Sequence, residues 1–156
     1  MKNSCDFNQY QQNQINTASP EQILLMLYDG AIRFTREAIV GVEEDKPEMR
    51  RHGVSRAMAI VTEFSNTLNH EIGGEIAEDL HELYAFMIRE LTSANMNNDV
   101  DKLQVVKTLL VDLRQTWGEA IDINRQEKAV AAAKAKVVTS ETTTPQAAYV
   151  PFSVSS

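Results

Sequence analysis

The sequence predicts an all-α protein, an antiparallel up-down four-helix bundle with a flexible N-terminal arm and a disordered C-terminal tail. Two observations lead to this class. Apolar residues recur at intervals of three and four positions in four stretches of about 20 residues each. Short turns rich in glycine, proline or asparagine separate these stretches, so successive helices should run antiparallel.

Residues 1–16 are polar and rich in asparagine and glutamine, which indicates a flexible arm. Phe7, Tyr10 and Ile15 interrupt this polar sequence. The arm is either a frayed terminus or a segment that docks on the body of the protein or on a partner.

The first helix is expected over residues 20–42. Ser19 is its predicted N-cap, Pro20 its first residue, and Gln22 completes a capping box. On a helical wheel one strip should face the core: Ile23, Leu24, Leu27, Ala31, Phe34 and Ala38. A second strip widens the apolar surface to roughly half the circumference: Leu25, Tyr28, Ile32 and Ile39. This surplus indicates a central position in the bundle or a surface kept for a partner.

Three more helices follow, over residues 47–71, 75–94 and 99–128. Pro47 lies in the first turn of the second helix, and Gly73-Gly74 are expected to end it. The third should bury a stripe of Ile76, Leu80, Leu83, Met87, Leu91 and Ala94. Asp99 caps the fourth, whose stripe includes Leu103, Leu110 and Trp117. Residues 17–128 therefore form the bundle, and 129–156 form a helical extension with a disordered tail.

Composition excludes several classes of partner. The formal net charge is -7, so no broad field attracts nucleic acid or anionic lipid. No apolar run approaches the roughly 20 residues that a membrane-spanning helix needs, and residues 1–7 lack the apolar core of a signal peptide. Cys5 is the single cysteine, which suits a reducing compartment. We expect a soluble, cytoplasmic protein.

The motifs of catalysis are absent from the sequence. There is no glycine-rich phosphate loop, no G-x-S-x-G and no Cys/His zinc pattern. The pair Glu78 and His81 forms a single Glu-x-x-His, whereas a di-iron bundle needs two such motifs and two further glutamates. We therefore expect a protein that holds no metal or cofactor and is not an enzyme. The surplus apolar surface indicates a binding module.

The chain resembles the FliS family of flagellin-specific export chaperones over roughly residues 7–125. The residues that carry the resemblance follow in order and spacing: Tyr10-Gln11-Gln12-Asn13, Asn16-Thr17-Ala18-Ser19-Pro20-Glu21, Leu25-Met26-Leu27-Tyr28-Asp29-Gly30-Ala31-Ile32, Gly73-Gly74-Glu75-Ile76-Ala77, Leu83-Tyr84-x-x-Met87-Ile88-Arg89-x-Leu91, Ala94-Asn95-x-x-Asn98-Asp99 and Trp117.

The resemblance implies a four-helix bundle without cofactor or catalysis. Family members bind the C-terminal segment of flagellin in the cytoplasm, prevent its premature polymerisation and deliver it to the flagellar type III export gate. It also implies that the arm covers the apolar site or contacts the gate, at Phe7, Tyr10 and Ile15. Helical wheels provide the candidates for flagellin contact: Leu25, Tyr28, Ile32, Ile60 and Tyr84. A flagellar regulatory protein as second client, and a homodimer in the absence of client, are further expectations.

Two rival hypotheses stay open at this stage. One is a generic four-helix adaptor or regulator with a different helical client, which would not bind a flagellin C-terminal peptide. The other is a metal-dependent bundle enzyme, which would contain stoichiometric iron or zinc.

Overall fold

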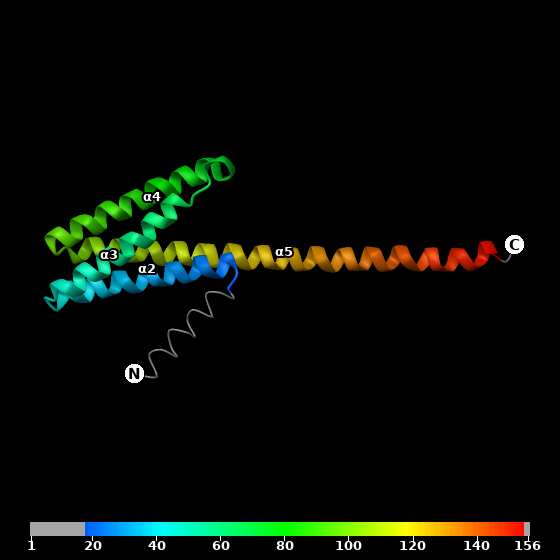
Figure 1. Ribbon diagram of the computed structural model, residues 1–156, viewed down its shortest axis with the longest axis horizontal. Coiled ribbons are helices and arrows are strands. Elements are labelled where there is room, and N and C mark those ends of the chain that lie inside the picture. Colours follow the sequence, from blue (N-terminus) through cyan, green and yellow to red (C-terminus); the bar gives the residue numbers. More distant parts are fainter. Residues whose placement is uncertain (1–17, 155–156) are drawn as a thin grey trace, which may run out of the picture. The chain divides into compact units, whose positions relative to one another are not determined.

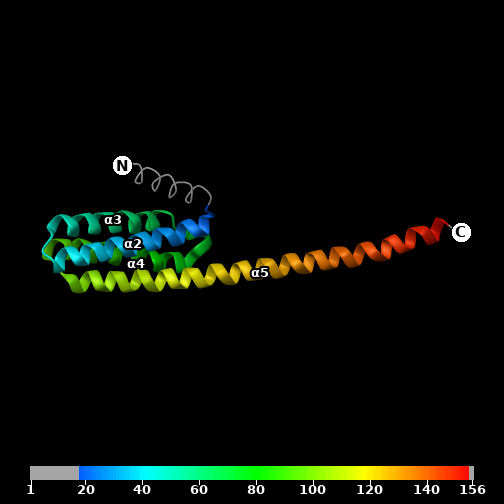
Figure 2. The same ribbon diagram turned by 90° about the horizontal axis from the view of Figure 1, so that it is seen from below.

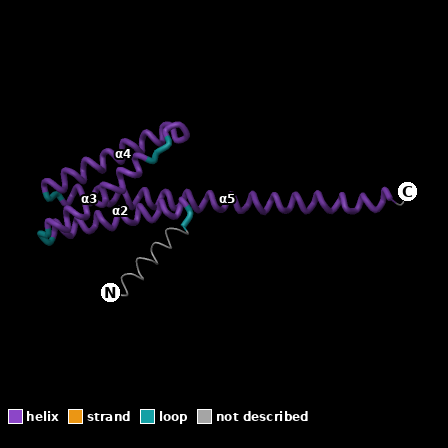
Figure 3. Tube along the Cα trace, viewed as in Figure 1, coloured by secondary structure: helices purple, strands orange, loops and turns teal. Residues whose placement is uncertain are grey.

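The computed structural model describes residues 18–154, with side chains over residues 18–138. The described helices are α2 (Pro20–Glu43), α3 (Pro47–Asn66), α4 (His70–Asn97) and α5 (Val100–Val154), and no strand occurs in this range (Figures 1 and 3). The chain divides after Trp117 into two compact units. The first contains α2, α3, α4 and the start of α5, and the second contains the rest of α5.

Within the first unit, short turns reverse the chain between successive helices (Figure 2). The predicted all-α, up-down four-helix bundle is confirmed. Phe7, Tyr10 and Ile15 lie outside the described residues.

Side-chain caps fix several helix ends where the sequence predicts them. The Ser19 hydroxyl accepts a hydrogen bond from the Gln22 amide at 3.2 Å, and the Gln22 side chain accepts one from the Ser19 amide at 3.0 Å. The Asp99 carboxylate accepts hydrogen bonds from the amides of Asp101 and Lys102 at the start of α5. The predicted capping box and the predicted Asp99 cap are both confirmed.

The predicted boundary between the second and third helices is wrong. α3 ends at Asn66, and α4 begins at His70, where the Asn69 side chain accepts a hydrogen bond from the Ile72 amide. Gly74 does not terminate a helix; it makes a kink inside α4 with φ 51° and ψ -122°, a conformation open to glycine. The N-cap at Asn69 therefore sets the start of α4, and the glycine pair lies inside this helix.

α5 also differs from the prediction at its C-terminal end. The alanine- and lysine-rich run 129–136 favours a helix. The helix continues to Val154, through the threonine-rich stretch that was expected to be a disordered tail. Once a helix has formed, each added residue contributes one more backbone hydrogen bond, which favours such continuation.

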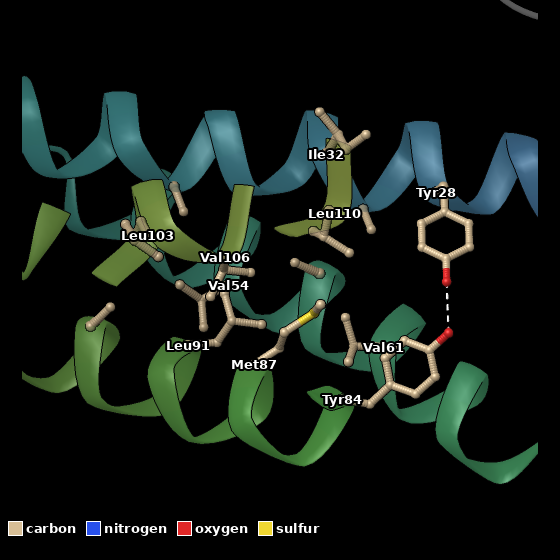
Figure 4. Close-up of a cluster of buried hydrophobic side chains, with 14 of the residues drawn as sticks. Tyr28, Ile32, Val54, Val61, Tyr84, Met87, Leu91, Leu103, Val106 and Leu110 are labelled. Carbon is tan, nitrogen blue, oxygen red and sulfur yellow. Dashed lines mark hydrogen bonds between the residues drawn. The ribbon is translucent and has the colours of Figure 1, made fainter. Parts of the chain in front are cut away.

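The core of the first unit lies where all four helices meet, and Figure 4 shows its centre. It includes the fully buried side chains of Val54, Val61, Met87, Leu91, Leu103, Val106 and Leu110. Thr35 is the buried polar residue of this region, and its hydroxyl donates to the Ala31 carbonyl at 2.7 Å. No buried side-chain nitrogen or oxygen in the described part of the chain lacks a hydrogen-bond partner.

Candidate functional site

The rotation of α2 about its axis differs from the prediction, and it decides which surface can bind a partner. The buried residues of α2 are Tyr28, Ala31, Ile32, Thr35, Ala38, Ile39 and Gly41. Much of the strip expected in the core is only half-buried: Ile23, Leu24, Leu27 and Phe34. The strip expected to be surplus thus faces the core.

Three of the five predicted client-contact residues are therefore inside the bundle. Tyr28, Ile32 and Tyr84 are 0%, 7% and 3% exposed, so the prediction that they form an accessible surface is wrong. Leu25 and Ile60 are half-buried, and their contact with a client stays a prediction. Burial of the two tyrosines has a physical reason, because each hydroxyl finds a partner inside the bundle.

A hydrogen-bonded aromatic cluster joins three helices in this region. The Tyr28 and Tyr84 hydroxyl oxygens are 2.6 Å apart (Figure 4), and the Trp117 indole N–H donates to the Tyr28 hydroxyl at 3.1 Å. The Tyr28 ring also stacks on Phe64 of α3, with ring centroids 4.3 Å apart. Burial raises the pKa of both tyrosines, so both hydroxyls keep their protons at neutral pH. The cluster is a structural connection between helices.

The half-buried apolar surface lies where α2 approaches α3. We name it the α2–α3 seam and define it as Leu27, Gly30 and Phe34 of α2 with Ile60 of α3. A Cβ placed on Gly30 would lie 3.5 Å from the Ile60 Cδ1, so these two residues are neighbours across the seam. Because Gly30 has no side chain, Ile60 is the side chain nearest to the α2 backbone at this point. The seam is therefore an apolar strip in which Ile60 of α3 packs beside a position of α2 that has no side chain.

Cationic side chains surround the Phe34 end of the seam. The guanidinium carbons of Arg33 and Arg56 lie 5.0 Å and 5.4 Å from the Phe34 ring centroid. The His52 imidazole meets the same ring edge-on at 5.8 Å and bonds to the Glu37 carboxylate at 2.8 Å. Arg33 and Arg56 are both exposed. Sequence reasoning missed these two arginines, because no spacing within one helix places them on the same ring.

Two further apolar side chains near the start of α4 are exposed, one of them where the sequence predicts burial. Ile76 is 69% exposed although it belongs to the stripe expected in the core, and Ile72 is 86% exposed. Both lie beside the Gly74 kink, which turns this part of α4 away from the direction that a continuous helix would follow.

The histidine, aspartate and glutamate side chains of the described residues are spread over the helices. Among residues 18–138, no group of three or more His, Cys, Asp or Glu side chains is placed to hold an ion. Glu78 and His81 are exposed, and His81 instead bonds through Nδ1 to the Ser65 hydroxyl at 2.9 Å. No helix in the described range is both long and apolar enough to cross a membrane.

Comparison with known proteins identifies the class to which this bundle belongs. A model of the family described as flagellar protein FliS matches residues 1–124. The flagellar secretion chaperone FliS of Campylobacter jejuni is 38% identical over 119 residues, which cover 76% of this chain and 93% of the relative. The FliS of Bacillus subtilis is 35% identical over 122 residues, covering 78% of this chain and 90% of the relative.

A solved structure supports the same fold. The crystal structure of a flagellar chaperone from bacteria matches with a TM-score of 0.62 at 19% identity, covering 77% of this chain and 98% of that one. The bundle thus belongs with the flagellar secretion chaperones, proteins that bind a client rather than convert a substrate. The chain is a member of the FliS family, which is a family of chaperones and not of enzymes.

Proposed function

We propose that this chain is a cytoplasmic export chaperone that binds the C-terminal segment of flagellin, prevents its premature polymerisation and delivers it to the flagellar type III export gate. The observation that carries the proposal is the α2–α3 seam, in which apolar side chains remain only half-buried beside the buried core. Membership of the FliS family supplies the flagellar context.

The seam has the chemistry that such a client needs. A client that folds on binding presents apolar residues at helical spacing, and an apolar surface on a bundle can hold them. Ordering such a segment costs roughly 2–5 kcal/mol, so a stable complex should bury more than a standard interface of about 1,600 Å². The client should therefore extend from the seam along further helices. Leu25, which precedes the seam on α2 and lies on another side of that helix, is a candidate for this wider contact.

We expect Ile60→Glu to weaken binding of a flagellin C-terminal peptide by about 100-fold, because a carboxylate would be buried in an apolar contact. Isothermal titration calorimetry with the full chain measures the affinity. Ile76→Glu is the matched control, since it adds the same charge at an isoleucine that is exposed on α4. Circular dichroism should show unchanged helix content in both variants.

Two outcomes of this titration would contradict the proposal. Equal losses in the two variants would mean that net charge, and not the seam, governs binding. A wild-type chain that does not bind the peptide would favour the alternative, a helical-bundle adaptor with another client.

The arm is proposed to contact the export gate through Tyr10, with Phe7 and Ile15 beside it. We expect Tyr10→Ala to leave the thermal unfolding midpoint of the bundle unchanged while reducing flagellin secretion or affinity for the gate component. Tyr10→Phe is the control, because it keeps the ring. Secretion and gate affinity that equal wild type in Tyr10→Ala would disprove this role.

A further inference from the structure

Arg33 and Arg56 have no carboxylate partner among the residues that the structure describes. Within the described residues, neither guanidinium forms an ion pair, although the chain carries 22 acidic residues. The carboxylates nearest to Arg33 along its helix are engaged elsewhere. Asp29 bonds to Arg114 of α5 at 3.0 Å, and Glu37 bonds to His52 of α3 at 2.8 Å.

The helical neighbours of Arg56 carry no acid at all. One turn to either side on α3 are His52, Gly53, Ala59 and Ile60. Both guanidinium groups instead lie over Phe34, at distances at which the positive charge is attracted to the ring face. A guanidinium that lies over an aromatic ring can still donate its N–H groups to an external acceptor.

Helix geometry fixes where an acceptor would lie relative to the seam. Gly30 and Phe34 are one turn apart on α2, which corresponds to about 6 Å along the helix axis. A client helix that lies along the seam with an apolar residue over Gly30 and Ile60 would bring a residue three or four positions away to the arginines. An Asp or Glu at that position would lie near these guanidinium groups, and the forked N–H donors of arginine match the geometry that carboxylates prefer.

We propose that Arg33 and Arg56 form an arginine clamp that binds a carboxylate of the client, three or four residues from the apolar residue that covers Gly30 and Ile60. This inference rests on the proposed function, because it assigns the charge pattern of the segment held on the seam. The formal net charge of -7 opposes a polyanion such as nucleic acid, whereas a single carboxylate in an apolar segment needs only these two arginines.

The test is a titration of the full chain with flagellin C-terminal peptides in which each Asp or Glu is changed singly to Asn or Gln. The double variant Arg33→Gln/Arg56→Gln should weaken binding of the unchanged peptide about tenfold, the size expected when two partly exposed charge contacts are lost together. One amide-substituted peptide should bind with the same weakened affinity to the wild-type chain and to the Arg33→Gln/Arg56→Gln variant, since the clamp and its partner form one interaction.

The double variant Arg36→Gln/Arg51→Gln is the matched control. It removes the same charge from exposed positions of α2 and α3, and neither arginine contacts Phe34. The control should bind like wild type. Raising the salt concentration should reduce wild-type affinity more than that of the Arg33→Gln/Arg56→Gln protein.

The outcomes separate the inference from the function on which it rests. The arginine clamp would be overturned if the two double variants bound the unchanged peptide equally well. It would also be overturned if, for every amide-substituted peptide, the loss of affinity from the peptide change added to the loss from Arg33→Gln/Arg56→Gln. Either result would leave client binding intact. A wild-type chain that does not bind the unchanged peptide would overturn the proposed function and the clamp together.

Discussion

Replacing Gly53 by alanine should lower the free energy of unfolding by about 2–3 kcal/mol, because the added methyl group has no space between α2 and α3. A Cβ at this position would lie 2.5 Å from the Phe34 carbonyl oxygen and 2.6 Å from the Ala38 backbone nitrogen. Both are backbone atoms inside a helix, so the two helices would have to move apart. Urea denaturation followed by circular dichroism measures the change.

Steric overlap and helix propensity predict opposite signs for the change in the free energy of unfolding, so the experiment distinguishes them. Helix propensity alone predicts that glycine to alanine inside a helix stabilises by about 1 kcal/mol. Gly30→Ala provides the control, because its Cβ would meet only the Ile60 side chain, at an ordinary contact distance of 3.5 Å. We expect Gly30→Ala to be neutral or stabilising. A Gly53→Ala protein as stable as the Gly30→Ala protein would contradict the close approach of α2 and α3.

The same close approach explains why the sequence predicts the fold better than the site. Helix starts at Ser19 and Asp99 depend on side chains within three residues of the cap, so local spacing suffices to find them. The rotation of α2 depends on Gly53, which brings the α3 backbone against residues 34–38. Both strips of α2 are apolar, so hydropathy alone does not determine which of them faces inward.

The candidate site was predicted only in part for a related reason. Helical wheels propose Ile60 for client contact, and Ile60 is half-buried in the seam, so that role stays a prediction. The arginine clamp could not be predicted from the sequence, because Arg33 and Arg56 belong to different helices and meet only at the Phe34 ring. The predicted boundary between the second and third helices is wrong because two local signals compete there: Asn69 as an N-cap and Gly73-Gly74 as a helix terminator. The Asn69 side chain makes its capping hydrogen bond, and Gly74 becomes a kink.

Tyr28→Ala should be the most damaging single substitution among those considered, with a loss of about 4 kcal/mol in the free energy of unfolding. Tyr28 is 0% exposed and stacks on Phe64, so its removal leaves a cavity where all four helices meet. It also deprives the Trp117 indole and the Tyr84 hydroxyl of their shared partner. Chemical denaturation measures the loss, and we expect the midpoint to fall without a change in cooperativity.

Tyr28→Phe separates the ring from its hydroxyl. It keeps the contact with Phe64 and removes only the two hydrogen bonds, which should cost about 1–3 kcal/mol because the Tyr84 hydroxyl is left buried without its partner. Trp117 is the single tryptophan, so its fluorescence reports on the lost hydrogen bond directly. Since Tyr28 lies inside the core, Tyr28→Phe should bind the flagellin peptide as wild type does. A selective loss of peptide affinity in a Tyr28→Phe protein of wild-type stability would instead make the hydroxyl a client contact, and the cluster would then have to open when the client binds.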